Sequence, residues 1–264
     1  MATDEIVHVA VAPPVRLEEN LIGLVAGIVN KDRQSTRVLL AGKIPKIIAH
    51  YDTVQMAELT ARSLMALGLV VIVCKDSELH KPLHVYRAHT LKFEEQTVIF
   101  RDKSGQVRRM ESRDAFLIIK GRMQTYTEKE VTTTRMKLNL PATLLTGGIP
   151  IWGKVKEKTK DQSVQTQGFA RLYDRTSAEP SVEILQYDFD YSLLGARMAA
   201  ASRANFDTTV TKFREVFPQA IFDERLTEPF LVDVPSATAQ ESIDISCKLI
   251  YLYHQAVSNP GSSA

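Results

Sequence analysis

Apolar residues in the first 75 positions follow two periods, that of a strand and that of a helix. The run IVHVAVA at 6–12 has the length of a strand and stops at Pro13. Apolar residues then recur at helical spacing over 17–28, although two glycines weaken that helix. The runs at 44–51 (IPKIIAHY) and 69–75 (LVVIVCK) predict two more strands.

The helix predicted between the last two strands has the clearest ends. Asp52 is placed to cap it, Gln55 follows three residues later as in a capping box, and Gly68 supplies a stop. Strands and helices therefore follow one another in the order β-α-β-α-β. This order predicts that residues 1–80 form a small α/β module, either ferredoxin-like or an open βαβαβ sheet, with both helices on one face.

From residue 83 onward the pattern is one of short strands separated by turn signals such as Lys103-Ser104-Gly105. Seven runs have strand length, at 83–93, 97–102, 106–111, 115–127, 150–159, 168–175 and 182–189. We therefore expect an antiparallel β-rich domain over 83–220, and an α+β fold for the whole chain.

A helix closes this β-rich domain in the prediction. Asn205 can cap it, and Phe206, Phe213 and Phe217 fall on one stripe that is typical of a core face. Seven short strands closed by an amphipathic helix resemble a pleckstrin-homology-like domain in architecture alone, and such a resemblance implies no particular ligand.

The rest of the chain is expected to form an extension. Residues 221–257 are predicted to be a C-terminal extension that contains a helix over 236–257, and residues 258–264 a disordered tail.

Composition makes the chain an ordinary globular protein, with 44% hydrophobic and 24% charged residues among 264. No run approaches the roughly 18 apolar residues of a membrane-spanning helix. The acidic start lacks the basic region of a secretory signal, so we expect a cytoplasmic protein. Cys74 and Cys247 are the only cysteines and are expected to be two buried thiols.

The charge is unevenly distributed along the chain. Residues 101–175 hold 16 Lys/Arg against 8 Asp/Glu, whereas the remainder holds 17 against 23. Trp152 begins a stretch in which Lys154, Lys156, Lys158 and Lys160 alternate, so on a strand these lysines would share a face. Such a row can bind an anionic ligand, or it can protect an edge strand from aggregation.

Several kinds of chemistry are not indicated. Gly148, Gly153 and Lys154 match the start of a phosphate-binding loop, but Val155 stands where that motif needs Ser or Thr. The sequence also lacks a G-x-S-x-G nucleophile elbow and a CxxC pair. We expect no cofactor.

Three histidines lie close together in ELHKPLHVYRAH, residues 78–89. Pro82 excludes a continuous helix from His80 to His84, and His84 and His89 would face opposite sides of a strand. The sequence therefore predicts no metal site from these residues unless ligands come from elsewhere in the chain, and it indicates a domain junction.

Two functional hypotheses remain open. The favoured one is a non-enzymatic binding or regulatory protein whose basic β domain docks an anionic or protein partner, and a homo-oligomer is compatible with it. The alternative is an enzyme with a site assembled at the junction between the two domains, and the first suspects are His50, His84, His89 and Asp188.

Overall fold

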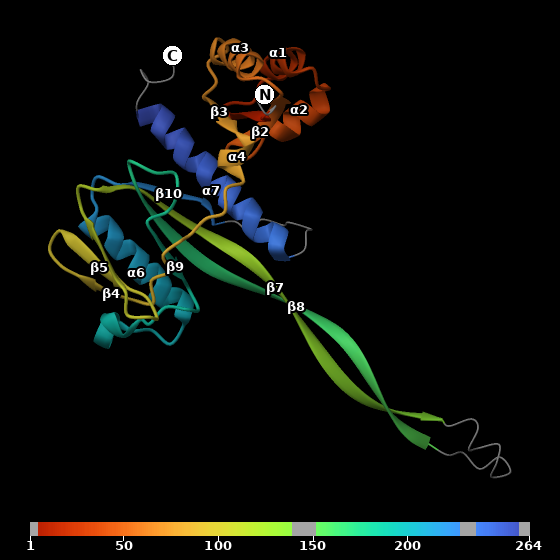
Figure 1. Ribbon diagram of the computed structural model, residues 1–264, viewed down its shortest axis with the longest axis vertical. Coiled ribbons are helices and arrows are strands. Elements are labelled where there is room, and N and C mark those ends of the chain that lie inside the picture. Colours follow the sequence, from red (N-terminus) through yellow and green to blue (C-terminus); the bar gives the residue numbers. More distant parts are fainter. Residues whose placement is uncertain (1–4, 139–151, 228–235, 259–264) are drawn as a thin grey trace. The chain divides into compact units, whose positions relative to one another are not determined.

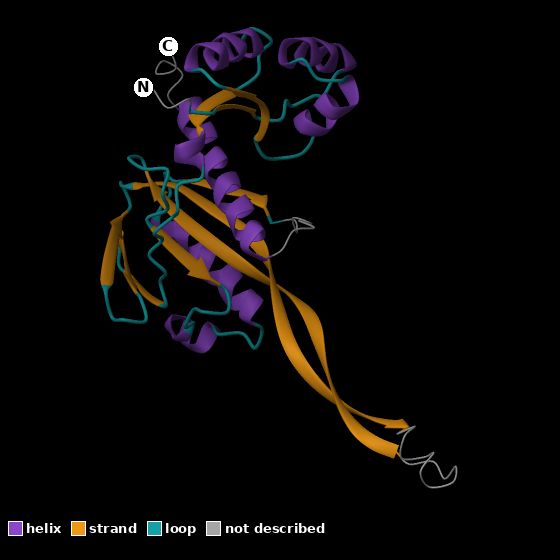
Figure 2. Cartoon of the chain, turned by 45° about the vertical axis from the view of Figure 1, so that its right-hand side comes forward, coloured by secondary structure: helices purple, strands orange, loops and turns teal. Residues whose placement is uncertain are grey.

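The computed structural model describes residues 5–138, 152–227 and 236–258, and for 124–138, 152–165 and 236–239 it describes the backbone alone. The protein is mixed α+β, with antiparallel sheets and helices. It divides into two compact units, one of residues 1–123 and 167–264 and one of residues 124–166. Figure 1 labels the elements in chain order, and Figure 2 distinguishes helices, strands and loops by colour.

The chain begins with a three-stranded sheet of β1 (Val7–Val11), β2 (Lys46–Tyr51) and β3 (Val71–Lys75). The predicted strands at 6–12, 44–51 and 69–75 are thus confirmed. The spatial order is β2-β1-β3, and both outer strands run antiparallel to β1. Side chains alternate between the faces of a strand, so β1 presents Val7, Val9 and Val11 to one face and His8 and Ala10 to the other.

Three helices connect these strands and cover one face of the sheet: α1 (Glu19–Val29), α2 (Arg33–Leu40) and α3 (Val54–Met65) (Figures 1 and 2). Val7, Val9 and Val11 form a buried cluster with apolar residues of these helices. Helix α2 was not predicted, because only Thr36 and Leu40 of its eight residues are buried and it has no apolar stripe to read.

The predicted cap of α3 is wrong by one residue. Thr53 is the N-cap, and its side-chain oxygen accepts a hydrogen bond from the Met56 backbone N–H at 3.4 Å, whereas Asp52 is exposed. A single-turn helix, α4 (Asp76–Leu79), follows β3 directly.

The β-rich region holds two sheets. One is an antiparallel meander of β4 (Thr90–Phe93), β5 (Thr97–Arg101) and β6 (Val107–Glu111). The other has the order β10-β7-β8-β9, built from β7 (Ala115–Leu138), β8 (Trp152–Asp174), β9 (Val182–Leu185) and β10 (Ile221–Leu226), the last parallel to β7.

The seven predicted runs correspond to six strands before the closing helix. The runs at 150–159 and 168–175 are parts of one long strand, β8, because the polar residues between them do not end the strand. The run at 83–93 forms a strand only from Thr90, and before it Arg87 makes a single bridge to Glu183.

Helix α6 (Ser202–Val216) closes this region and is preceded by a 3₁₀ segment, η1 (Ser192–Arg197). Phe206, Phe213 and Phe217 are buried in a cluster with residues of both sheets, as expected. Asn205 is not the cap, because α6 begins three residues earlier. Its side chain instead accepts from the backbone N–H of Ala199 at 2.6 Å and donates to the Ala199 carbonyl at 2.9 Å.

Helix α7 (Ser236–Ser258) belongs to two buried clusters. Leu249 packs with Ala10 and Ile72 on the open face of the N-terminal sheet, and Cys247 and Ile250 pack with residues of β7 and β8. Cys74 and Cys247 are free and buried, as predicted, and burial raises the pKa of each thiol to about 11. The predicted tail at 258–264 lies outside the described residues, apart from Ser258.

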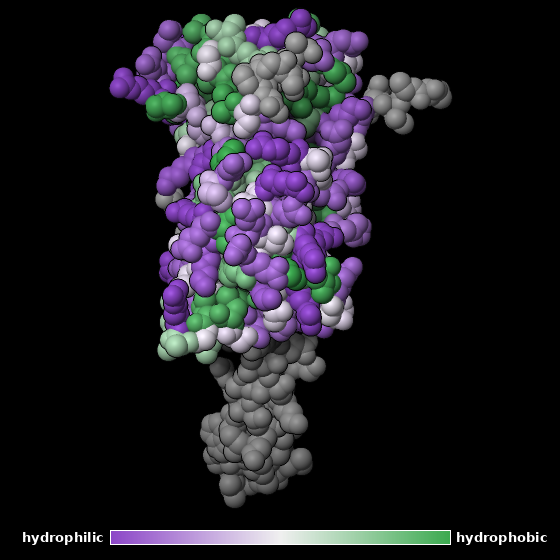
Figure 3. Space-filling model, turned by 90° about the vertical axis from the view of Figure 1, so that its left-hand side faces the viewer, coloured by the Kyte–Doolittle hydropathy of each residue, from purple (hydrophilic) through white to green (hydrophobic). Residues whose placement is uncertain are grey.

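On the face drawn in Figure 3 polar side chains predominate, and apolar ones form separate patches. Within the described part of the chain, every helix is too short or too polar to cross a membrane.

Candidate functional site

Two groups of side chains in the first compact unit have the chemistry of a binding site. One is an arginine-rich pocket in the β-rich region, and the other is a histidine–aspartate cluster in the N-terminal sheet.

The arginine-rich pocket has a volume of about 490 Å³ and lies against β6 and the turn that follows β8. Its lining residues are Arg108, Arg109, Met110, Arg113, Asp114, Asp174, Arg175, Thr176 and Ser181. Four arginines against two aspartates give this pocket an excess of two positive charges. It falls inside the basic stretch that the sequence singled out, apart from its last two lining residues.

Aromatic contacts position two of these guanidinium groups. Met110 points into the core, so Arg108 leaves β6 on the same side, where its guanidinium carbon lies 4.8 Å from the centre of the Tyr86 ring. Arg108 also donates a hydrogen bond to the Ser181 carbonyl. The guanidinium of Arg175 lies 4.8 Å from the centre of the Phe116 ring, a cation–π contact that leaves its N–H groups available.

One of the two acidic residues of the pocket, Asp174, is already satisfied by hydrogen bonds from neighbouring lining residues. Asp174 accepts hydrogen bonds from the Thr176 backbone N–H (2.8 Å), the Thr176 hydroxyl (2.6 Å) and the Ser181 hydroxyl (2.9 Å). Burial alone would raise the pKa of Asp174, but these hydrogen bonds outweigh it and lower that pKa, so the carboxylate is ionised and already satisfied.

The arginines differ in how they are paired. Arg113 is paired with Glu111 at 2.9 Å. Among the described residues, Arg109 and Arg175 have no ion-pair partner.

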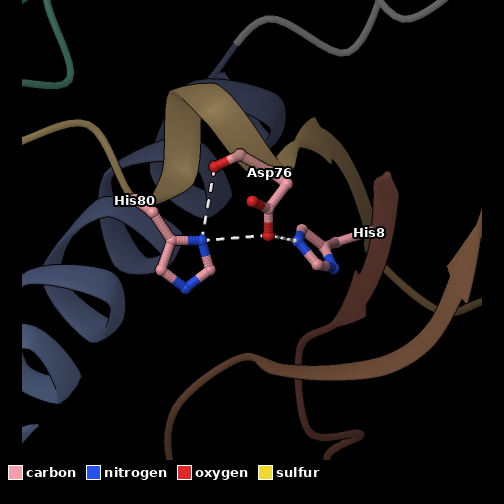
Figure 4. Close-up of side chains that lie close together, drawn as sticks. All are labelled: His8, Asp76 and His80. Atoms are coloured by element: carbon pink, nitrogen blue, oxygen red, sulfur yellow. Dashed lines mark hydrogen bonds and ion pairs between the residues drawn. The ribbon is translucent and has the colours of Figure 1, made fainter. Parts of the chain in front are cut away.

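The histidine–aspartate cluster joins the first and third strands of the N-terminal sheet (Figure 4). The buried His8, in the central strand β1, donates from Nε2 to Asp76 Oδ1 at 2.8 Å. His80 Nδ1 lies 3.0 Å from the same oxygen. Asp76 begins α4 and His80 follows its last residue, so a single helical turn beyond the end of β3 places both beside His8.

A fourth residue, His50, extends this cluster. It is the direct cross-strand partner of His8, and the two Nδ1 atoms lie 2.7 Å apart. The hydrogen bond from His8 is the largest cause that lowers the pKa of Asp76. Three polar side chains that are far apart in sequence thus share one hydrogen-bonded chain, from His50 through His8 to Asp76.

The structure separates the residues suspected of catalysis. His50 lies beside His8 in the N-terminal sheet, and His84 is exposed in the segment before β4. Only His89 and Asp188 are brought together, where His89 Nδ1 donates to the Asp188 carbonyl at 2.6 Å. The Asp188 carboxylate is paired with Lys103.

The residues proposed for the basic row lie on β8 from its first residue onward, namely Trp152, Lys154, Lys156, Lys158 and Lys160. Their side chains fall outside the described part of the structure.

Sequence reasoning singled out His80 and His50 but missed His8, Asp76 and the arginines of the pocket. His8 is visible as the one polar residue inside VHVAV, a signal that its side chain has a buried partner. Nothing local pairs it with Asp76, because the register of β1 with β3 is set by tertiary packing. The arginines were covered only by the count of charges over 101–175.

No protein-family model, curated protein or solved structure matches this chain.

Proposed function

We propose that this is a binding protein whose basic β region takes an anionic, phosphate-bearing ligand in the arginine-rich pocket. The observation that carries the proposal is the state of Arg109 and Arg175. Both residues line the same pocket, and neither forms an ion pair with a described residue.

Guanidinium chemistry supports this ligand class. Arginine presents its N–H donors in a rigid fork that matches the oxygens of a phosphate or carboxylate, and two such forks around one cavity can hold a polyanion. The volume of about 490 Å³ lies in the range of small-molecule sites, roughly 300–1,000 Å³. A pocket of that size favours a compact phosphate-bearing ligand over an extended acidic protein segment.

Calorimetric titration of the full chain with inorganic pyrophosphate tests the proposal. We expect saturable binding that weakens at least about tenfold in Arg109→Gln and in Arg175→Gln, since a charge-assisted hydrogen bond contributes roughly 1.5–3 kcal/mol. Arg197→Gln is the matched control, because Arg197 is exposed and lies outside this pocket. Binding should also weaken strongly at about 0.5 M NaCl.

Three results would contradict the proposal. They are no saturable binding of pyrophosphate, equal loss in the Arg197→Gln control, and pyrophosphate binding that is unchanged in both pocket variants. A polyglutamate peptide in the same assay distinguishes the other ligand class. If it bound more tightly than pyrophosphate and depended on the same arginines, the ligand would be an acidic protein segment.

The alternative from the sequence, an enzyme with a site at a domain junction, has less support. Of its four suspects only His89 and Asp188 are neighbours, and they meet through a backbone carbonyl.

The finer fold assignments are also proposals. They are a ferredoxin-like or open βαβαβ module over 1–80 and a pleckstrin-homology-like domain over 83–220. Support for the second is that both sheets of the β region and α6 enclose one buried cluster.

A further inference from the structure

We propose that His8, Asp76 and His80 form a binding site for a divalent transition-metal ion, with Zn²⁺ as the best match. This site is separate from the arginine-rich pocket and does not depend on the function proposed for that pocket. Each residue offers one donor atom, and the three atoms lie within 4.8 Å of one another.

The donor geometry is close to that of a metal site. His8 Nε2 and His80 Nδ1 lie 2.8 and 3.0 Å from Asp76 Oδ1. Bonds of about 2.0–2.1 Å to a tetrahedral ion place neighbouring donor atoms about 3.3 Å apart. These two separations therefore need to increase by only a few tenths of an ångström. The third separation, between His8 Nε2 and His80 Nδ1, can be shortened by rotation of the half-exposed His80 side chain.

The outer contact of His8 favours the same conclusion. A metal-binding histidine usually donates its other ring N–H to an acceptor, which fixes the tautomer and orients the ring. If His8 binds the ion through Nε2, its proton sits on Nδ1, and His50 Nδ1 is 2.7 Å away to accept it. For His80, the Glu241 Oε1 lies 3.9 Å from Nε2, beyond hydrogen-bond distance, so His8 alone has an outer acceptor in place.

The framework around the three donors is fixed by packing. His8 is 4% exposed in the central strand of the sheet. The buried Lys248 of α7 donates to the carbonyls of Glu78, Leu79 and Lys81, which flank His80 in sequence. Donors held in advance in this way lose little conformational entropy when an ion binds.

The kind of ion follows from the donor set and from exposure. Two imidazoles and one carboxylate suit borderline ions such as Zn²⁺, Co²⁺ and Ni²⁺, whereas Mg²⁺ and Ca²⁺ prefer oxygen ligands alone. The side chains of Asp76 and His80 are 42% and 39% exposed. Solvent or a small ligand can therefore reach the coordination position that three protein donors leave open.

The test measures Zn²⁺ affinity in the full chain after treatment with a chelator and dialysis, by competition with a chromophoric chelator near neutral pH. We expect one ion per chain. Affinity should fall by more than about 100-fold in His80→Ala and in Asp76→Asn, and by about 10–100-fold in His50→Ala, which removes only an outer partner. Co²⁺ should give visible absorption bands that His80→Ala abolishes.

His84→Ala is the matched control, because His84 is an exposed histidine of the same short stretch that the structure places outside the cluster. Its affinity should equal that of the unmodified chain. His80 and Asp76 are partly exposed, so their variants should fold, and circular dichroism verifies this. The proposal is overturned if the unmodified chain binds neither ion stoichiometrically, or if His80→Ala and Asp76→Asn bind as tightly as His84→Ala.

Discussion

At the residue scale, one buried electrostatic arrangement outside the two sites is centred on Asp223 of β10. His254 Nε2 lies 2.7 Å from its Oδ2, and Arg225 donates to both carboxylate oxygens at 2.6 to 3.1 Å. Burial would raise the pKa of Asp223, but the hydrogen bonds from His254 and Arg225 prevail and hold it well below the ordinary value. This buried carboxylate is thus kept ionised, and it joins β10 to α7.

The Asp223→Asn variant tests this arrangement. A carboxylate whose pKa is lowered by folding stabilises the protein above its unfolded pKa of about 3.9, and that contribution is lost as the pH falls below it. We expect the variant to lose about 3 kcal/mol of unfolding free energy at neutral pH and to lose less than the unmodified chain on acidification. Urea denaturation at neutral and acidic pH measures both effects.

The control for this variant is Asp52→Asn. Asp52 is exposed and does not cap α3, so its substitution should change the unfolding free energy by no more than about 0.5 kcal/mol. Equal effects of the two substitutions, or identical acid sensitivity of Asp223→Asn and the unmodified chain, would contradict the role given to Asp223.

At the element scale, the close packing of the four-stranded sheet depends on Gly121 in β7. A methyl group at this position would lie 2.9 Å from Leu226 Cβ and closer still to the ring of Phe169, both of which are buried. The ring fills the space that any larger residue at 121 would need, so this glycine is required by packing, since its φ angle is ordinary.

Gly121→Ala should therefore lower the unfolding free energy by about 1–3 kcal/mol, the cost of overpacking a core. Gly27→Ala is the matched control: Gly27 lies in α1, and apart from the neighbouring backbone of that helix no atom is within 4 Å of an added methyl group. It should raise the unfolding free energy by roughly 0.5–1 kcal/mol, because alanine is the better helix former. Chemical denaturation measures both, and the same sign for the two variants would refute the packing argument.

Helices and strands could be predicted from the sequence where the buried residues form a short local apolar pattern. The three strands of the N-terminal sheet and the phenylalanine stripe of α6 were found because each is a short apolar pattern. The extent of β8 and the antiparallel pairing of β1 with both neighbours could not be read this way. The register that opposes His8 to His50, and so builds one candidate site, depends on contacts between residues 42 positions apart.

At the scale of the whole molecule, α7 connects the buried clusters of the N-terminal sheet and the β region. The sequence predicted a helix over these residues, but not that it would pack on both the N-terminal sheet and the four-stranded sheet. Lys248 is the polar part of this connection. It is 5% exposed, and its ammonium donates to the carbonyls of Glu78 (3.0 Å), Leu79 (2.8 Å) and Lys81 (2.8 Å), so one buried cation satisfies three backbone acceptors beyond the end of β3.

Lys248→Met preserves the aliphatic part of the side chain and removes these three hydrogen bonds. Because partly buried carbonyls would lose their donor, we expect a loss of about 3 kcal/mol in unfolding free energy. The loss should be concentrated in the N-terminal sheet: amide hydrogen exchange should accelerate in β1, β3 and α4 more than in β9 and α6, since only the former depend on this anchor. Lys92→Met, which changes an exposed lysine of β4, should leave the exchange pattern unaltered. Uniform acceleration of exchange throughout the chain would contradict this prediction. It would mean that the N-terminal sheet and the β region unfold as one cooperative unit, and that Lys248 stabilises both equally.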